Sequence, residues 1–61
     1  MPIIRVEMYE GRSLDQKREL VDVLTREASR ILKCGPDQVH VVIENISKEN
    51  WGLGGKLAVD G

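Results

Sequence analysis

The sequence predicts an α+β fold: a single βαβ unit with parallel strands and a C-terminal hairpin, assembling into oligomers. Three observations predict it. Residues 3–9 alternate apolar and polar side chains, residues 14–33 repeat apolar side chains at three- and four-residue steps, and residues 39–46 form a β-branched run. A strand, a long helix and a second strand form a βαβ unit whose strands are parallel and whose crossover is right-handed.

The first predicted strand is buried on one side only. Apolar side chains occupy one face of residues 3–9: Ile4, Val6 and Met8. Gly11 ends this strand. Ser13 and Gln16 then have the spacing of a capping box, so a helix is expected to begin directly after Ser13.

The predicted helix extends from about Leu14 to Lys33. Its apolar stripe consists of Leu20, Val21, Leu24, Ala28, Ile31 and Leu32. On the solvent face, Asp22 lies one turn from both Arg18 and Arg26, and we expect it to form ion pairs with both.

Two residues after the helix predict how it ends. Gly35 suits a left-handed cap, and Pro36 cannot continue a helix. The second strand is predicted over Val39 to Ile46, with one face formed by Val39, Val41 and Ile43. Residues 50–55 are rich in turn-forming residues, which predicts a tight hairpin before a short tail.

The chain is short for a stable fold on its own. Its 61 residues form one domain at most, residues 1–61, and such a chain buries only about 60% of its unfolded surface. Cys34 is the only cysteine and His40 the only histidine, so neither an internal disulfide nor a structural zinc site is available. Two strands under one helix also leave sheet edges and one sheet face uncovered. We therefore expect self-association.

Charge and hydropathy exclude several kinds of partner. Nine basic and ten acidic residues give a formal charge of −1, and no basic block indicates nucleic-acid binding. The longest apolar runs are far shorter than the roughly 20 residues of a membrane span. No charged-then-apolar leader follows Met1. We expect a cytoplasmic protein with no membrane partner.

The beginning of the chain is the one candidate for chemistry, because no nucleophile triad, phosphate-binding loop or metal cluster is recognisable. Methionine is generally removed before a residue as small as Pro2, which would leave a secondary amine at the head of a strand. Apolar burial and nearby guanidinium groups would lower the pKa of that amine from about 7.7–8.0. The amine would then be a neutral base at pH 7. An ordinary strand beginning is the alternative.

Several segments, in this order, resemble the 4-oxalocrotonate tautomerase family. They are Pro2-Ile3, Glu10-Gly11-Arg12-Ser13, Asp15-Gln16-Lys17, Ile43-Glu44 and Trp51-Gly52-Leu53-Gly54-Gly55. The resemblance covers nearly the whole chain. It implies the tautomerase fold and homohexamers built as trimers of dimers. It also implies an isomerase without metal or cofactor, which converts 2-hydroxymuconate to 2-oxo-3-hexenedioate in the catabolism of aromatic compounds.

The resemblance implies roles for four residues. Pro2 matches the catalytic base, and Arg12 matches an arginine that holds a substrate carboxylate through two parallel hydrogen bonds. Trp51 matches an aromatic residue that makes the pocket apolar. His40 is a departure, because characterised members carry an arginine there that polarises the 2-oxo group, whereas a neutral imidazole brings no permanent charge. A substrate contact and a merely structural or exposed histidine are both open for His40.

Strand geometry indicates that such a site needs two chains. Pro2 and His40 are expected at one end of the parallel sheet, whereas Arg12 lies beyond the other end, roughly 25 Å from Pro2. An antiparallel edge-to-edge dimer would bring the partner's Arg12 to Pro2. The expected substrate is a small 2-oxo or 2-hydroxydienoic acid. Two alternatives remain: a dehalogenase- or hydratase-like enzyme of the same superfamily, and a non-catalytic oligomerising subunit.

Overall fold

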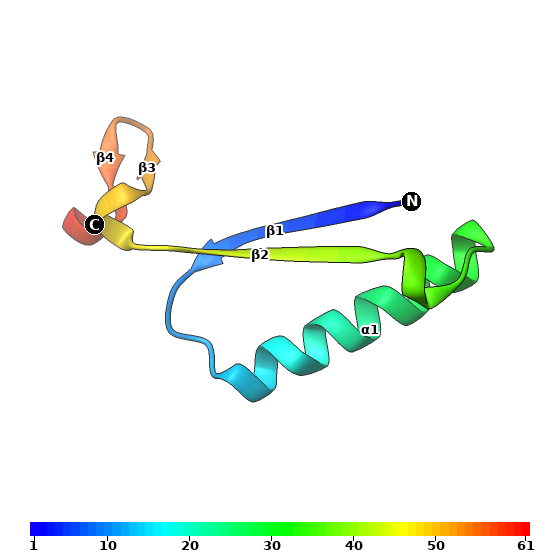
Figure 1. Cartoon of the computed structure of the whole chain (residues 1–61). Coiled ribbons are helices and arrows are strands. Elements are labelled where there is room, and N and C mark those ends of the chain that lie inside the picture. Colours follow the sequence, from blue (N-terminus) through cyan, green and yellow to red (C-terminus); the bar gives the residue numbers. More distant parts are fainter.

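The computed structural model describes all 61 residues, and its main unit is a two-stranded sheet with one long helix on one face (Figure 1). Strands β1 (Ile3–Tyr9) and β2 (His40–Ile46) are parallel and pair along their full length. Helix α1 (Leu14–Leu32) connects them and runs back along the sheet. The predicted βαβ unit is therefore confirmed, with β2 beginning one residue later than expected.

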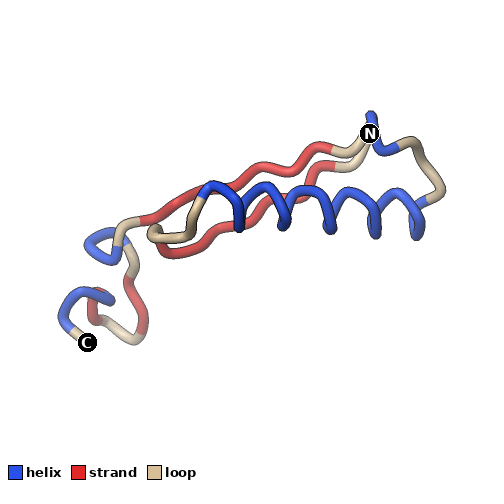
Figure 2. Tube along the Cα trace, turned by 90° about the horizontal axis from the view of Figure 1, so that it is seen from below, coloured by secondary structure: helices blue, strands red, loops and turns tan.

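The two faces of the sheet have different environments, because α1 covers only one of them (Figure 2). The half-buried strand side chains alternate along the sequence: Ile4, Val6, Met8, Val41 and Ile43. The intervening side chains form what we call the open face, and all of them are exposed: Ile3, Arg5, Glu7, His40, Val42 and Glu44. The period of two in the sequence thus corresponds to one face against the helix and one without a cover.

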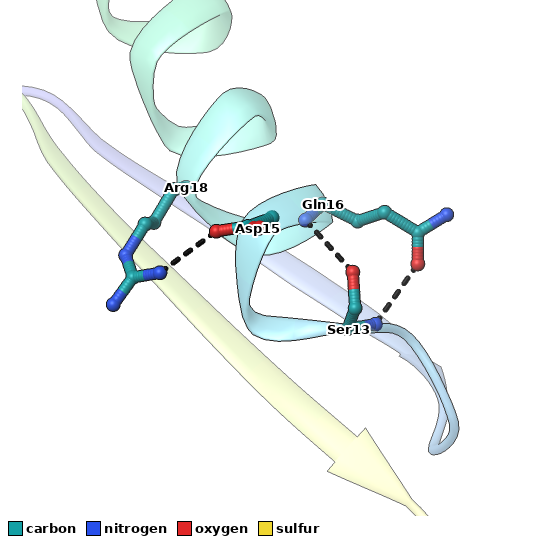
Figure 3. A network of polar contacts seen from close by, with 4 residues as sticks. All are labelled: Ser13, Asp15, Gln16 and Arg18. Atoms are coloured by element: carbon teal, nitrogen blue, oxygen red, sulfur yellow. Dashed lines mark hydrogen bonds and ion pairs between the residues drawn. The ribbon is translucent and has the colours of Figure 1, made fainter.

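Helix α1 begins with the predicted capping box (Figure 3). The Ser13 hydroxyl accepts a hydrogen bond from the backbone N–H of Gln16 at 3.1 Å, and the Gln16 side-chain oxygen accepts one from the backbone N–H of Ser13 at 2.9 Å. These two bonds satisfy N–H groups that the first turn of a helix leaves without a partner.

The end of α1 differs from the prediction, since Gly35 is not its left-handed cap. Lys33 takes that conformation with φ 55°, and its backbone N–H donates to the carbonyl of Ser29. Gly35 is extended, with φ −70°. A residue before proline is restricted to extended conformations, so Pro36 prevents Gly35 from forming the cap, and the helix ends earlier. The prediction for Gly35 was wrong for this reason.

Three ion pairs lie on the solvent face of α1. Arg26 and Asp22 are 3.3 Å apart, as predicted. The predicted pair of Arg18 with Asp22 is wrong, because Arg18 reaches back to Asp15 at 2.8 Å (Figure 3). The third pair joins the side chains of Arg30 and Glu27. All are exposed, and such pairs contribute at most about 1 kcal/mol each.

The C-terminal segment confirms the predicted hairpin and leads away from the βαβ unit (Figure 1). It contains short elements beyond β2: η2 (Lys48–Asn50), β3 (Gly52–Leu53), β4 (Lys56–Leu57) and η3 (Ala58–Asp60). Strands β3 and β4 are antiparallel. The turn between them places Gly54 at φ 62° and Gly55 at φ 85°. A two-residue turn with two positive φ angles favours glycine at both positions, which accounts for the Gly-Gly pair.

The isolated chain has no interior. None of the 61 residues is buried, and the total exposed area is 4860 Å². A compact monomer of this mass would expose about 4000 Å². The radius of gyration is 14.6 Å, and the chain measures 43 × 24 × 13 Å. A compact domain of this length would have a radius of gyration of about 10.5 Å. The fold is therefore an extended slab that needs other molecules to cover it.

The apolar side chains show which parts lack a cover. Within the predicted helical stripe, Leu20, Leu24 and Ala28 are half-buried against the sheet, whereas Val21, Ile31 and Leu32 are exposed. Other exposed apolar side chains lie at the amino terminus and along the C-terminal segment: Met1, Ile3, Leu53, Leu57 and Val59. Neither α1 nor any shorter helix combines the length and apolarity needed to cross a membrane.

Candidate functional site

Pro2 lies at the head of β1, next to the beginning of β2. Its side chain is half-buried, and its carbonyl accepts a hydrogen bond from the backbone N–H of His40 at 3.0 Å. Ile3, the next residue, pairs with His40 in the sheet register. Met1 is 82% exposed. The structure thus brings Pro2 and His40 together at one end of the sheet, as the strand geometry predicted.

The open face that leads away from Pro2 carries more negative than positive charge. The Arg5 guanidinium contacts the Glu44 carboxylate at 2.7 Å. Glu7 pairs with Glu44 in the sheet register, so two carboxylates stand side by side on adjacent strands. Arg5 is the only cationic side chain on this face, and its ion pair with Glu44 leaves Glu7 without a counter-charge.

An aromatic pair, Tyr9 and Trp51, lies at the opposite end of the sheet. The ring centroids are 4.6 Å apart with an interplanar angle of 63°, an edge-to-face arrangement that is favourable for aromatic rings. The ammonium of Lys48 lies 5.5 Å from the centroid of the Tyr9 ring. Beside the pair is an open hollow of about 260 Å³, and its lining consists of Glu7, Ile46, Asn50, Trp51 and Gly52.

Arg12 lies at the same end of the sheet as the aromatic pair, in the loop between β1 and α1. Its side chain is exposed and forms none of the ion pairs in the chain. The whole length of β1 separates Arg12 from Pro2 (Figure 1). One chain therefore does not bring Pro2 together with either Arg12 or Trp51. The candidate residues instead lie in two groups, one at each end of the sheet.

Sequence reasoning did not anticipate the contact between Tyr9 and Trp51. Tyr9 ends β1 and Trp51 follows shortly after β2. The carboxyl ends of parallel strands meet at the same edge of a sheet, so this signal was present in the sequence. The pairing of Glu7 with Glu44 was also missed, because it depends on the register of the two strands, which cannot be read from the sequence alone. No group of three or more His, Cys, Asp or Glu side chains converges where a metal ion could bind.

The parallel βαβ unit, the glycine hairpin and a proline at the head of β1 define a class of small-subunit proteins with the tautomerase fold. The family model described as "Tautomerase enzyme" matches residues 2–61. A probable tautomerase of Halalkalibacterium halodurans is 40% identical over 60 residues, which cover 98% of both chains. The chain belongs to the tautomerase family.

Solved structures agree with this assignment. A 4-oxalocrotonate tautomerase homologue superposes with a TM-score of 0.93 at 38% identity, covering 100% of this chain and 97% of that one. A 4-oxalocrotonate tautomerase from Chloroflexus aurantiacus superposes with a TM-score of 0.90 at 30% identity, covering 98% of this chain and 97% of that one. The Chloroflexus protein is a heterohexamer. These structures confirm the expected resemblance to the 4-oxalocrotonate tautomerase family and the expected fold.

Proposed function

We propose that this chain is a cofactor-independent tautomerase that interconverts enol and keto forms of 2-oxo acids, with 2-hydroxymuconate as a representative substrate. The nitrogen of Pro2, freed by removal of Met1, takes the proton from the enol hydroxyl and returns a proton to a carbon of the conjugated chain. The electron pair moves along the conjugated system, so nothing is oxidised or reduced. The observation that carries the proposal is a family match that begins at Pro2, in a fold that leaves Pro2 at the open end of its sheet.

The local structure suits Pro2 for this role. Its carbonyl is held by the His40 backbone, so the pyrrolidine ring has a fixed position relative to β2. Met1, in contrast, projects into solvent and is accessible for removal. A secondary amine covered by apolar groups of neighbouring copies loses stabilisation of its cationic form, which favours the neutral base.

The proposal includes assembly into a homohexamer, a trimer of dimers. The absence of any buried residue supports self-association, because the exposed area exceeds that of a compact monomer of this mass by several hundred Å². An antiparallel pairing of sheet edges would bring the Pro2 end of one copy to the Arg12 end of another. Each site is then built by at least two chains.

Three further side chains complete the proposed site. The partner's Arg12 holds the substrate carboxylate, for which its free guanidinium is suited because it has no competing carboxylate in its own chain. The partner's Trp51 forms an apolar wall. His40, beside Pro2, donates a hydrogen bond to the 2-oxo group.

The test is replacement of the proline ring nitrogen. In full-length protein whose intact mass shows that Met1 is absent, Pro2→Ala should lower kcat for ketonisation of 2-hydroxymuconate by at least about 100-fold, the usual contribution of a general base. Pro36→Ala is the matched control, since it removes the chain's other proline, which lies within the connection between α1 and β2. Full turnover by a correctly assembled Pro2→Ala protein would refute the proposal.

A non-catalytic role within a mixed assembly is the second candidate, and the heterohexameric Chloroflexus homologue favours it. A chain of this kind would occupy a subunit position without performing chemistry itself. The same assay separates the two candidates, because the purified chain alone should turn over substrate if it is a tautomerase. If activity appears only after co-assembly with a second family member and survives Pro2→Ala in this chain, the non-catalytic role is correct.

A further inference from the structure

The charges along the open face disfavour a substrate with two carboxylates. Glu7 and Glu44 lie side by side, and the single arginine on the face is paired with Glu44 at 2.7 Å. His40 contributes an imidazole, which lacks the permanent charge of a guanidinium. Like charges at close range inside a partly enclosed site repel each other strongly.

The hollow beside Trp51 adds a second observation. It contains the Glu7 carboxylate and the apolar side chain of Ile46, and no cationic side chain lines it. The indole of Trp51 packs edge-to-face against Tyr9 and gives the hollow a flat apolar wall. A flat apolar group packs well against such a wall, whereas a carboxylate would meet Glu7.

We propose that this chain selects 2-oxo acids with a single carboxylate and a flat, uncharged substituent such as an aryl ring. The inference rests on the proposed function and specifies its substrate class. The partner's Arg12 binds the one carboxylate, and the ring lies in the hollow against the partner's Trp51. Glu7 and Trp51 are then the residues that determine specificity. Glu7 excludes a second carboxylate, and Trp51 attracts the ring.

Lys48 contacts the aromatic pair, so the effect of its positive charge on substrate preference has to be considered. Its ammonium lies 5.5 Å from the centroid of the Tyr9 ring, and Lys48 is outside the lining of the hollow. Its contact is with the face of an aromatic ring, an interaction that favours the cation where it is. Lys48→Met should therefore leave the preference between substrates unchanged.

The experiment compares phenylenolpyruvate, which has one carboxylate and an aryl ring, with 2-hydroxymuconate, which has two carboxylates. For the assembled wild-type protein without Met1, we expect kcat/KM to be at least about tenfold higher for phenylenolpyruvate. Glu7→Gln keeps the size of the side chain and removes its charge. It should raise kcat/KM for 2-hydroxymuconate by about threefold or more, and raise kcat/KM for phenylenolpyruvate by a smaller factor, because that acid has only one carboxylate. Glu19→Gln is the matched control. It makes the same exchange of carboxylate for carboxamide at an exposed position on α1 and should change neither value.

A second variant tests the aromatic wall. Trp51→Leu should lower kcat/KM for phenylenolpyruvate by about 2- to 12-fold, the value of an aromatic contact beyond its apolar area, and Trp51→Phe should restore most of it. A wild-type preference for 2-hydroxymuconate would overturn the inference, provided that Pro2→Ala still abolished turnover of both acids. Loss of the preference for phenylenolpyruvate in Lys48→Met would overturn it as well. Equal effects of Glu7→Gln on both substrates would also overturn it. Turnover that survives Pro2→Ala would instead refute the proposed function.

Discussion

Lys33 is the only residue other than glycine with a positive φ, and the left-handed turn that ends α1 falls on this residue. A side chain in the left-handed region is less favourable there than glycine. Lys33 nevertheless has to adopt the left-handed conformation, because Pro36 holds Gly35 extended. The strain is local and can be relieved by a single substitution.

We predict that Lys33→Gly raises the free energy of unfolding by about 0.5 kcal/mol, because glycine removes the steric cost at φ 55° while adding some freedom to the unfolded chain. Urea unfolding at a fixed protein concentration measures it. Gly35→Ala is the control, since φ −70° suits any residue and the added Cβ would meet only the flexible Asp37 carboxylate, at 2.5 Å. A larger loss from Gly35→Ala than the gain from Lys33→Gly would contradict this account.

His40 offers a second prediction at the scale of one residue. His40→Arg should raise kcat/KM for 2-hydroxymuconate by about tenfold, because a permanent cation beside Pro2 stabilises the developing enolate. The side chain is exposed and only its backbone bonds to Pro2, so the fold should tolerate the change. Steady-state assays of the arginine variant beside His40→Gln check it. An equal gain from glutamine would show that charge is irrelevant at this position.

Among the secondary-structure elements, α1 begins where the capping box of Ser13 and Gln16 closes its first turn, directly after the loop from β1. Ser13 and Gln16 exchange two hydrogen bonds across the first turn. The loop that they hold also carries Arg12, so the cap positions a proposed substrate-binding residue as well as the helix.

Ser13→Ala should lower the free energy of unfolding by about 1 kcal/mol, the usual effect of losing an N-cap side chain. Ser13→Asp should retain the stability, since a carboxylate accepts the same hydrogen bond and favours the helix dipole. Thermal unfolding of the three proteins at one concentration gives the comparison. If alanine and aspartate behaved alike, the cap would not stabilise the helix.

The elements were predictable from the sequence because each has a local cause. The alternation of residues 3–9, the Ser13 cap and the Gly54-Gly55 turn act over a few residues, and the structure contains all of them. The prediction for Gly35 was wrong because Pro36 restricts the residue before it to extended conformations, even where that residue is glycine. The register that sets Glu7 beside Glu44 joins residues far apart in the chain, so local patterns could not supply it. The contact of Tyr9 with Trp51 follows only when the ends of β1 and β2 are placed at the same edge of the sheet.

The single chain is a slab whose faces and ends are exposed, and the proposed assembly would cover them with other copies. We predict that its melting temperature rises with protein concentration, because assembly stabilises only the folded chain. Scanning calorimetry over a hundredfold range of concentration measures the shift, and native mass spectrometry shows whether the assembly is a hexamer. A concentration-independent melting temperature for a monomer would contradict the role we give to the exposed surfaces.

The separation of Pro2 from Arg12 predicts complementation between inactive chains. Pro2→Ala and Arg12→Gln should each be inactive alone, yet refolding an equal mixture should restore about a quarter of the wild-type activity, since random pairing gives that share of intact sites. Mixing the two proteins after separate assembly is the control. Failure of the co-refolded mixture to gain activity would mean that each chain supplies a whole site.

The lack of a buried residue in the single chain has a consequence for how the protein comes into being. In the proposed assembly, a newly made polypeptide completes its packing only when it meets another copy, so the rate of maturation depends on the square or a higher power of chain abundance. Until that encounter the chain remains exposed to proteolysis. Gene dosage therefore sets both the amount of mature protein and the fraction of synthesised chains that survive to form it.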